Sequence, residues 1–547
     1  MFRSVFKALL LIVALVAAVY YGVAWYHSTS LGPGQASDDW EENDFLDLGK
    51  LEGLDSVLMN RQGIDPNNYT ALMHADQGSL VLPRDIFLAL KTVDGGQAFT
   101  DPANMLRYRY LPGRQTEANP DGLPIGFSRS QKLWQGEEFV GLTCSACHSG
   151  MLTYKGTGLY IIGAPTQADF QTMTEELGAA LAATLQDPAR LSEMAAALNT
   201  DPAKLRPRLE REDALLQARL QINASPLRYG YGRVDAVGQI YNQATSVNLG
   251  LPQNATPPVA PVSYPHIWGT GQADVAQWTG FAPNDIIGSI LLRNVGEVIG
   301  VFGRVDVDPG KEAFPSSVNI EELGDLEDWV NRMEPPAWPE DIFGAIDRDV
   351  AAEGEALYNR HCKGCHKRAD PYEDYKATLV SPDELGVDPL AARATLATAQ
   401  TLDGSKKPKL KMLIEQTFQV VLDHPGEMVE AIIEGAVLDK FGKRGGFTYK
   451  ARTLNGIWAT PPYLHNGSVP TLYDLLSPPE ERPKTFTLGG WEFDPERVGL
   501  APHDGADGFI FDTSLPGNRN TGHDSRIFGT TFTPDQRLAL IEYLKTF

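Results

Sequence analysis

The chain has 547 residues, of which 42% are hydrophobic and 21% charged, so it is long enough for two or three domains and has a globular rather than a disordered composition. It carries 70 acidic and 47 basic side chains, and the net charge of −23 argues against a nucleic-acid partner, because such a surface repels phosphate. A small basic redox protein would suit this surface as a partner, although an acidic surface also simply keeps a protein soluble.

The first 30 residues form a separate segment. Arg3 and Lys7 precede an uncharged apolar run from Ala8 to Tyr26, and the next charged residues, from Asp38 onward, are acidic. This asymmetry places the start of the chain in the cytoplasm and the rest outside. Because the run can just span a bilayer, we predict that residues 1–30 are a signal anchor, a transmembrane helix holding the protein on the periplasmic side of a bacterial inner membrane. A cleaved signal peptide, giving a soluble periplasmic or secreted protein, is the alternative.

Composition divides the remaining chain. Residues 31–50 are rich in glycine, proline and acidic side chains, which is typical of a linker. Residues 51–340 are assigned to an N-terminal domain and residues 341–547 to a C-terminal one, with a proline-rich stretch at their boundary. Within the first domain, residues 166–222 show apolar side chains three and four positions apart, which predicts a pair or trio of amphipathic helices. Short alternating segments are rare, so a mainly helical protein with long loops is expected.

All four cysteines belong to two copies of one motif, Cys144-Ser-Ala-Cys147-His148 and Cys362-Lys-Gly-Cys365-His366. On one helical turn the two sulfurs share an edge, where they can add to the vinyl groups of a haem, and the histidine beside them can ligate the iron. A redox dithiol or a zinc site would also use paired cysteines, but neither explains a histidine after each pair. The motifs therefore predict two covalently attached c-type haems, with His148 and His366 as iron ligands.

The sixth ligand of each iron decides between electron transfer and chemistry, because only an open iron admits peroxide or dioxygen. No methionine follows Met428, so a ligand supplied by the end of the chain cannot be a thioether. His523 lies on a glycine-rich loop just before the predicted terminal helix and could approach a flat macrocycle. An ordinary surface histidine is the alternative.

The run from Arg452 to Ser468, RTLNGIWATPPYLHNGS, resembles the signature of bacterial di-haem cytochrome c peroxidases and their relatives, which include the di-haem enzyme that matures tryptophan tryptophylquinone and the di-haem rubber oxygenases. Three further segments resemble the rubber-oxygenase-like branch most closely: Asp121–Phe127, Leu152–Gly156 and Ile541–Thr546. The resemblance extends from about residue 50 to the end of the chain.

This resemblance implies two cytochrome c-like haem domains facing each other, with an oxidant-binding haem in the N-terminal domain and an electron-passing haem in the C-terminal one. In the oxygenase-like branch a histidine near the chain end closes the C-terminal haem, and only His523 matches that position. The predicted fold class is therefore mainly α: two cytochrome c-like haem domains with long irregular loops, preceded by the N-terminal membrane helix.

Candidates for chemistry at the first haem must lie between the motifs. Arg293 and Glu297 are four residues apart on a predicted helix at Leu291–Gly300, and they could form an acid–base pair over the haem. An ordinary ion pair on one helix face is the alternative. Trp268 and Trp278 could carry electrons between the haems or line an apolar pocket, although tryptophans also commonly serve the core. His74 could cap the first iron and close it.

Three functions follow from these candidates. The first is a membrane-anchored di-haem peroxidase that reduces hydrogen peroxide at the N-terminal haem with electrons relayed by the C-terminal haem from a small redox protein. The second is an oxygenase that binds dioxygen and cleaves an apolar substrate. The third is a two-haem electron carrier without catalysis. A calcium ion between the domains is an additional cofactor that the sequence leaves open.

Overall fold

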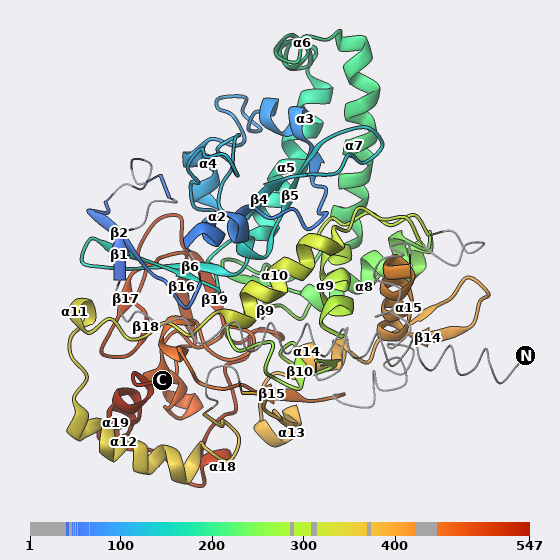
Figure 1. The fold of residues 1–547 in the computed structure, drawn as a ribbon. Coiled ribbons are helices and arrows are strands. Elements are labelled where there is room, and N and C mark those ends of the chain that lie inside the picture. The colour runs from blue at the N-terminus through green and yellow to red at the C-terminus, as the bar shows by residue number, and fades with distance from the viewer. Residues whose placement is uncertain are drawn as a thin grey trace, which may run out of the picture.

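The structure is a computed structural model that describes residues 40–42, 46–47, 49, 51, 53–64, 66–284, 289–307, 314–368, 373–422 and 446–547. Figure 1 shows how the chain runs through it. The predicted anchor at residues 1–30 and most of the predicted linker at residues 31–50 lie outside the described residues.

The predicted fold class, a mainly α protein preceded by a membrane helix, is wrong. Of the described residues 38% are helical and 17% are in strands, and none of the helices they form is long and apolar enough to cross a membrane. The strands could not be recognised from the sequence pattern because they are only two to six residues long. Several are buried on both faces, such as Phe139–Leu142, so polar and apolar residues do not alternate along them.

Two small sheets hold the first cysteine motif. One has the strand order β1–β2–β7–β6, in which β2 and β7 are parallel and β6 and β7 form a hairpin. The other has the order β3–β5–β4 and is antiparallel. Strand β5 ends just before Cys144 and β6 begins directly after His148, so the motif is a turn between two buried strands. Their bounds are β1 Trp40–Glu42, β2 Ser56–Asn60, β3 Leu82–Pro83, β4 Phe127–Arg129, β5 Phe139–Leu142, β6 Ser149–Tyr154 and β7 Thr157–Ile162.

The helices predicted within residues 166–222 are confirmed as α5 (Phe170–Gln186), α6 (Pro188–Ala197) and α7 (Pro202–Ile222), which extend together at one end of the molecule (Figure 1). Each begins after an aspartate whose side chain accepts a hydrogen bond from a backbone amide of the first turn. The other helices of the N-terminal part are α2 Pro66–His74, α3 Arg84–Ala89, α4 Pro102–Arg107, α8 Ala236–Asn242 with the π-helical turn η3 Gln243–Val247, α9 Ser289–Gly300 and α10 Ile320–Arg332.

Short elements fill the middle of the chain. They are η4 Pro252–Asn254, β8 Arg233–Val234, β9 Val262–Ser263, β10 Val275–Ala276, β11 Ala282–Pro283, α11 Glu340–Phe343, β12 Thr378–Val380, α13 Pro382–Leu385, α14 Leu390–Ala394, β13 Thr398–Gln400, β14 Lys406–Pro408 and α15 Lys409–Leu422. Strand β15 (Tyr449–Ala451) pairs antiparallel with β12, and Lys450 lies opposite Leu379.

The second cysteine motif lies at the end of a helix pair. Helix α12 (Arg348–His361) packs along α19 (Pro534–Leu544), as Figure 1 shows. The crossing is close because Gly354 faces the backbone of Ala539, where any side chain would clash. The remaining elements are η5 Ile457–Ala459, α17 Leu472–Leu475, η6 Pro479–Glu481, β16 Thr485–Leu488, β17 Phe493–Asp494, β18 Gly499–Leu500, β19 Phe509–Asp512 and α18 Ser525–Phe528.

The largest hydrophobic core joins both halves of the chain. It contains Trp268 from the N-terminal half together with Trp458, Phe493 and Phe547 from the C-terminal half. Main-chain contact also crosses between the halves, since the Thr153 amide donates to the Trp491 carbonyl at 2.7 Å. The division into residues 51–340 and 341–547 stays a prediction. The shared core fixes the two cysteine motifs relative to each other.

Candidate functional site

The first motif is a 3₁₀ turn, Cys144–Ala146, that Thr143 caps by accepting a hydrogen bond from the Ser145 amide. The His148 Nδ1 lies 2.7 Å from the Pro265 carbonyl oxygen. Because a carbonyl can only accept, Nδ1 carries the proton and Nε2 keeps its lone pair for a metal. Burial lowers the pKa of His148 to about 4, so the imidazole is in the neutral form that ligates iron.

The second motif follows α12 directly and repeats this geometry. The His366 amide donates to the Cys362 carbonyl at 2.9 Å, which closes the turn. The His366 Nδ1 lies 2.7 Å from the Arg452 carbonyl oxygen, so its Nε2 is also left for a metal. Burial lowers the pKa of His366 as well. Both motifs are therefore prepared as sites for a histidine-ligated iron.

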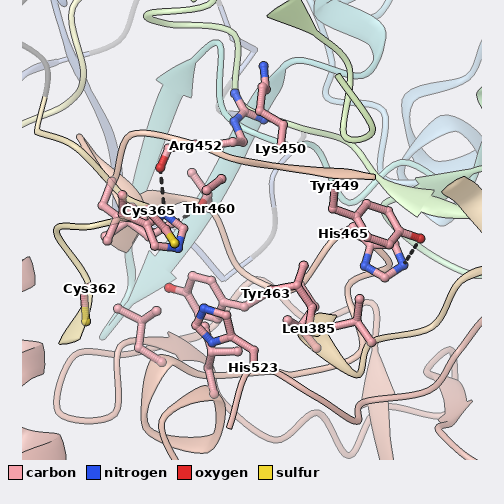
Figure 2. A pocket seen from close by; sticks show the side chains of 18 of the residues that line it. Cys362, Cys365, Leu385, Tyr449, Lys450, Arg452, Thr460, Tyr463, His465 and His523 are labelled. Atoms are coloured by element: carbon pink, nitrogen blue, oxygen red, sulfur yellow. Dashed lines mark hydrogen bonds between the residues drawn. The ribbon is translucent and has the colours of Figure 1, made fainter. Parts of the chain in front are cut away.

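His523 and His366 line the same cavity, in which Figure 2 shows His523. The two ring centroids are 6.0 Å apart and the rings are inclined by 73°. Metal–imidazole bonds of about 2.0 Å would place two axial rings with their centroids about 6 Å apart, so the spacing suits one iron between them. The His523 amide donates to Leu385 and its carbonyl accepts from Arg482, which fixes the loop, while the His523 Nδ1 is buried without a hydrogen-bond partner.

The cavity between these histidines fits a flat apolar group. The cysteines of the second motif lie at one edge, and most other lining side chains are apolar, including Leu385, Leu472 and Phe528. A haem has an apolar macrocycle, two vinyl groups for the cysteines and two carboxylates. The residues present therefore fit a covalently attached haem held by Cys362 and Cys365, with His366 and His523 on its two faces.

A short hydrogen-bonded strip joins the two motif histidines. His148 donates to the Pro265 carbonyl, and the next carbonyl, that of His266, accepts from the Arg452 guanidinium. The Arg452 carbonyl in turn accepts from His366. The His266 ring stacks on Trp268 with centroids 4.6 Å apart and planes inclined by 14°. Two chain segments thus run together between the motifs and link the two candidate iron ligands.

The structure places Arg293 and Glu297 beside the first motif but not as partners of each other. Arg293 forms a buried ion pair with Glu327 of α10 and donates to the Asn284 side chain at 2.8 Å. Glu297 instead accepts a hydrogen bond from the Gln277 amide at 2.7 Å. The alternative to the predicted acid–base pair, an ordinary ion pair between these two residues on one helix face, is therefore not formed, and each residue instead contacts a segment that is distant in sequence.

The electrostatic environment locates Glu297 near the cysteines of the first motif. Burial raises the pKa of Cys144 and of Cys147 to about 12, and the Glu297 carboxylate contributes to both shifts. Burial also raises the pKa of Glu297 itself, while Arg293 opposes that shift. A partly buried carboxyl group with a raised pKa near the cysteines of a candidate haem site is well suited to accept and return a proton. Sequence reasoning missed Gln277, although it is adjacent to the candidate Trp278, because its hydrogen bond to Glu297 forms only in the folded chain.

The remaining candidates have structural contacts. Trp268 is 1% exposed, and its indole N–H donates to the Asn455 carbonyl at 2.8 Å. Trp278 donates to the Ser263 carbonyl at 2.8 Å, lines the cavity, and has the Arg452 guanidinium 5.4 Å from its ring centroid. His74 ends α2 and its Nδ1 lies 2.7 Å from the Phe127 carbonyl. In the described part of the chain, the ring that contacts His148 is that of Tyr264, and the two ring centroids are 6.5 Å apart. It is a phenol and not a second imidazole.

The described residues contain no group of three or more His, Cys, Asp or Glu side chains that could hold a further metal ion. The calcium ion considered from the sequence therefore stays a prediction.

Comparisons with known proteins fit this site. Residues 448–487, which include β15 and several lining residues of the cavity, match a family model described as RoxA-like, cytochrome c-like. The uncharacterized protein y4iJ of Sinorhizobium fredii (strain NBRC 101917 / NGR234) is 32% identical over 92% of this chain and 95% of its own length. The uncharacterized protein y4iM of the same strain is 28% identical over 53% of this chain and 66% of its own length.

The matched cytochrome c-like segment implies covalently bound haem and points to a haem oxidoreductase or oxygenase in general. It supports the rubber-oxygenase-like side of the resemblance and leaves the peroxidase side as a prediction. Similarity to y4iJ extends over nearly the whole of both proteins. The chain therefore belongs to the same family as y4iJ and contains a RoxA-like, cytochrome c-like segment.

Proposed function

We propose that the protein is a di-haem c-type cytochrome that reduces hydrogen peroxide at the haem of Cys144, Cys147 and His148. Cys362, Cys365, His366 and His523 would hold a second haem, which would supply electrons to the first. The observation that carries this proposal is the partly buried, hydrogen-bonded pair of Glu297 and Gln277 near the cysteines of the first motif. C-type haem is attached outside the cytoplasm, so a periplasmic location accompanies the proposal.

The chemistry assigned to Glu297 is proton transfer. A bound haem with an open iron supplies the cleavage of the O–O bond. The Glu297 carboxylate accepts the proton from one peroxide oxygen and returns it to the other, which leaves as water. Gln277 donates to one carboxylate oxygen and so fixes the direction in which the other can act. Two electrons and two protons from outside complete the conversion of one hydrogen peroxide into two water molecules.

Electrons enter at the second motif in this scheme. Lys363 and Gly364, between its two cysteines, are exposed, whereas the corresponding Ser145 and Ala146 of the first motif are buried. A small redox protein can therefore approach the second haem edge more closely than the first. The strip of Pro265, His266 and Arg452 then offers a short route between the two irons.

The test is peroxide-dependent oxidation of a reduced donor, such as ABTS, by the full chain with its haems attached. Replacing Glu297 with Gln keeps size and hydrogen bonding but removes the base, and it is expected to lower kcat/KM for peroxide about 10²- to 10⁴-fold. The matched control is Glu321→Gln on the exposed side of α10, which is expected to leave the rate unchanged. Wild-type turnover in the Glu297 variant, or no peroxide turnover by the unmodified protein, contradicts the proposal.

A second candidate is oxygenation of an apolar substrate, which the RoxA-like match of residues 448–487 favours. In that case dioxygen rather than peroxide is consumed, and no reduced donor is needed. Oxygen uptake by the fully haem-loaded protein in the presence of squalene, with products cleaved at a double bond, would select this candidate over the peroxidase.

A further inference from the structure

Two basic side chains, the buried Lys450 and the partly buried Arg452, lie between the two motifs, and in the part of the chain that the structure describes neither has an acidic partner. Lys450 lies in β15, Arg452 follows directly after the last residue of that strand, and both line the cavity of the second motif. Lys450 is only 8% exposed. In Figure 2 both side chains extend away from His523, on the far side of Cys365. This part of the cavity wall therefore carries two basic side chains that are largely shielded from solvent.

Each of the two cations has few protein partners. Lys450 donates from its ammonium to the Val275 carbonyl at 3.0 Å, and Arg452 donates to the His266 carbonyl. An ammonium has three N–H donors and a guanidinium has five, so most donors are left over. Among the residues that the structure describes, neither cation forms an ion pair with Asp or Glu. Burying a charge without a partner costs several kcal/mol, which makes an absent anion the natural explanation.

Other buried cations of this protein are satisfied by the chain itself. The Arg482 guanidinium donates to six backbone carbonyls, at Asp474, Leu475, Ser477, Asn520, Gly522 and His523. The Lys409 ammonium, which is 1% exposed, donates to both the Asn254 carbonyl and the Thr256 hydroxyl. Lys450 and Arg452 therefore differ from these cations in their unused donors and in facing the cavity.

The surrounding charges strengthen the case for an anion. Burial lowers the pKa of Lys450 well below its usual value, Arg452 and Arg293 lower it further, and Asp274 opposes them. Arg293 already has Glu327 as its partner. A positively charged Lys450 next to Arg452 therefore requires an anion beside it, and a group with two carboxylates would supply one to each side chain.

We propose that Lys450 and Arg452 bind the two propionate carboxylates of the haem attached to Cys362 and Cys365. The cavity that contains the cysteines and both candidate axial histidines is the one these two cations line. The propionates then lie toward His266 and Trp278, on the side of the first motif, where they complete the charge balance between the two haems. The inference rests on haem attachment at the second motif, which the proposed function shares, but not on any reaction with peroxide.

The test compares midpoint potentials of the second haem by spectroelectrochemical titration of the full chain. Removing the cation in Lys450→Met leaves a propionate charge uncompensated and stabilises ferric iron. We expect about a tenfold change in the ferric-to-ferrous ratio, a downward shift of about 59 mV for one electron. The variant should also gain a pH dependence of the potential between pH 6 and 8, because the unpaired propionate takes up a proton on reduction.

Two controls separate this effect from loss of folding. Lys409→Met removes a buried lysine outside the cavity and should leave the potential unchanged. Arg452→Lys keeps the charge and should shift the potential less than Arg452→Gln. Haem stoichiometry, measured as the pyridine haemochrome, checks attachment independently of peroxide turnover.

The unmodified protein gives a test that needs no variant. Ion-paired propionates stay ionised, so its second-haem potential should be flat between pH 6 and 8. A pH-dependent potential in the unmodified protein, or equal potentials in the Lys450 and Lys409 variants, overturns the proposal.

Discussion

The two cysteine motifs are built alike on one side and differently on the other. In both, the motif histidine donates from Nδ1 to a backbone carbonyl at 2.7 Å and presents Nε2. Across from His366 lies a second imidazole, His523, whereas among the described residues the ring in contact with His148 is the phenol of Tyr264 and no second imidazole is in ring contact with it. The comparison teaches that the motif determines only the proximal half of a haem site, and that distant segments of the chain determine what the iron can do.

The strongest way to test this comparison is to remove each site separately. Replacing Cys144 and Cys147 with Ser, or Cys362 and Cys365 with Ser, is expected to halve the covalent haem content, because each pair supplies both thioether bonds of one haem. Mass spectrometry of the denatured full chain measures the number of attached haems. Loss of both haems from either variant, or of neither, would contradict two independent sites.

Removal of His523 should make the second site resemble the first. His523→Ala takes away the proposed sixth ligand, so the second haem is expected to change completely from a low-spin to a high-spin ferric spectrum and to bind added imidazole, which restores the low-spin form. His503→Ala, a histidine on another loop of the same region that pairs with Asp507, is the matched control. An unchanged spectrum in the His523 variant would remove it from the ligand set.

The charged residues near the first motif can be tested for their contribution to the free energy of unfolding, separately from any catalytic role. Arg293 and Glu327 form an ion pair whose side chains are 9% and 13% exposed. Arg293→Met leaves the Glu327 carboxylate buried and unpaired, and it is expected to lower the free energy of unfolding by about 3–5 kcal/mol.

A double variant distinguishes the loss of the ion pair between Arg293 and Glu327 from a loss of packing. Arg293→Met combined with Glu327→Leu removes both charges, and it should recover most of the lost stability in urea denaturation. If the double variant is as unstable as the single one, the loss comes from packing and not from an unpaired charge.

Sequence reasoning located the parts of these sites that depend on local spacing. The two Cys-x-x-Cys-His turns and the helices α5 to α7 follow from patterns within a few residues, and the structure has them as expected. His523 was singled out by its loop and by family resemblance, and the structure brings it within 6.0 Å of His366. Its role as a ligand stays a prediction.

Side-chain contacts between segments that are distant in the chain could not be predicted from the sequence. Glu297 meets Gln277 from a loop, and Arg293 meets Glu327 from α10, because these segments come together only in the fold. The strands around the first motif were missed because burial on both faces removes the alternation by which strands are recognised. The excess charge of Lys450 and Arg452 likewise becomes visible only when their burial and the absence of an acidic partner among the described residues are known.

The smallest expected effect concerns how Glu297, near the first motif, makes the free energy of unfolding depend on pH. Burial raises the pKa of Glu297 above the ordinary glutamate value of 4.5, so folding favours the protonated carboxyl group relative to the unfolded chain. The stability that this group contributes is present below pH 4.5 and is lost as the pH rises through the folded-state pKa. Glu297→Gln cannot ionise and therefore escapes this loss.

The same substitution that removes peroxide turnover should therefore stabilise the protein, by about 0.5–2 kcal/mol at pH 8, with the gain shrinking toward pH 5. Urea denaturation of both proteins at pH 5, 6.5 and 8 measures the difference. A variant that is less stable than the unmodified protein at pH 8 would mean that the carboxylate is held in its ionised form by favourable contacts. Glu297 would then be a structural anion rather than a base kept ready beside the first iron.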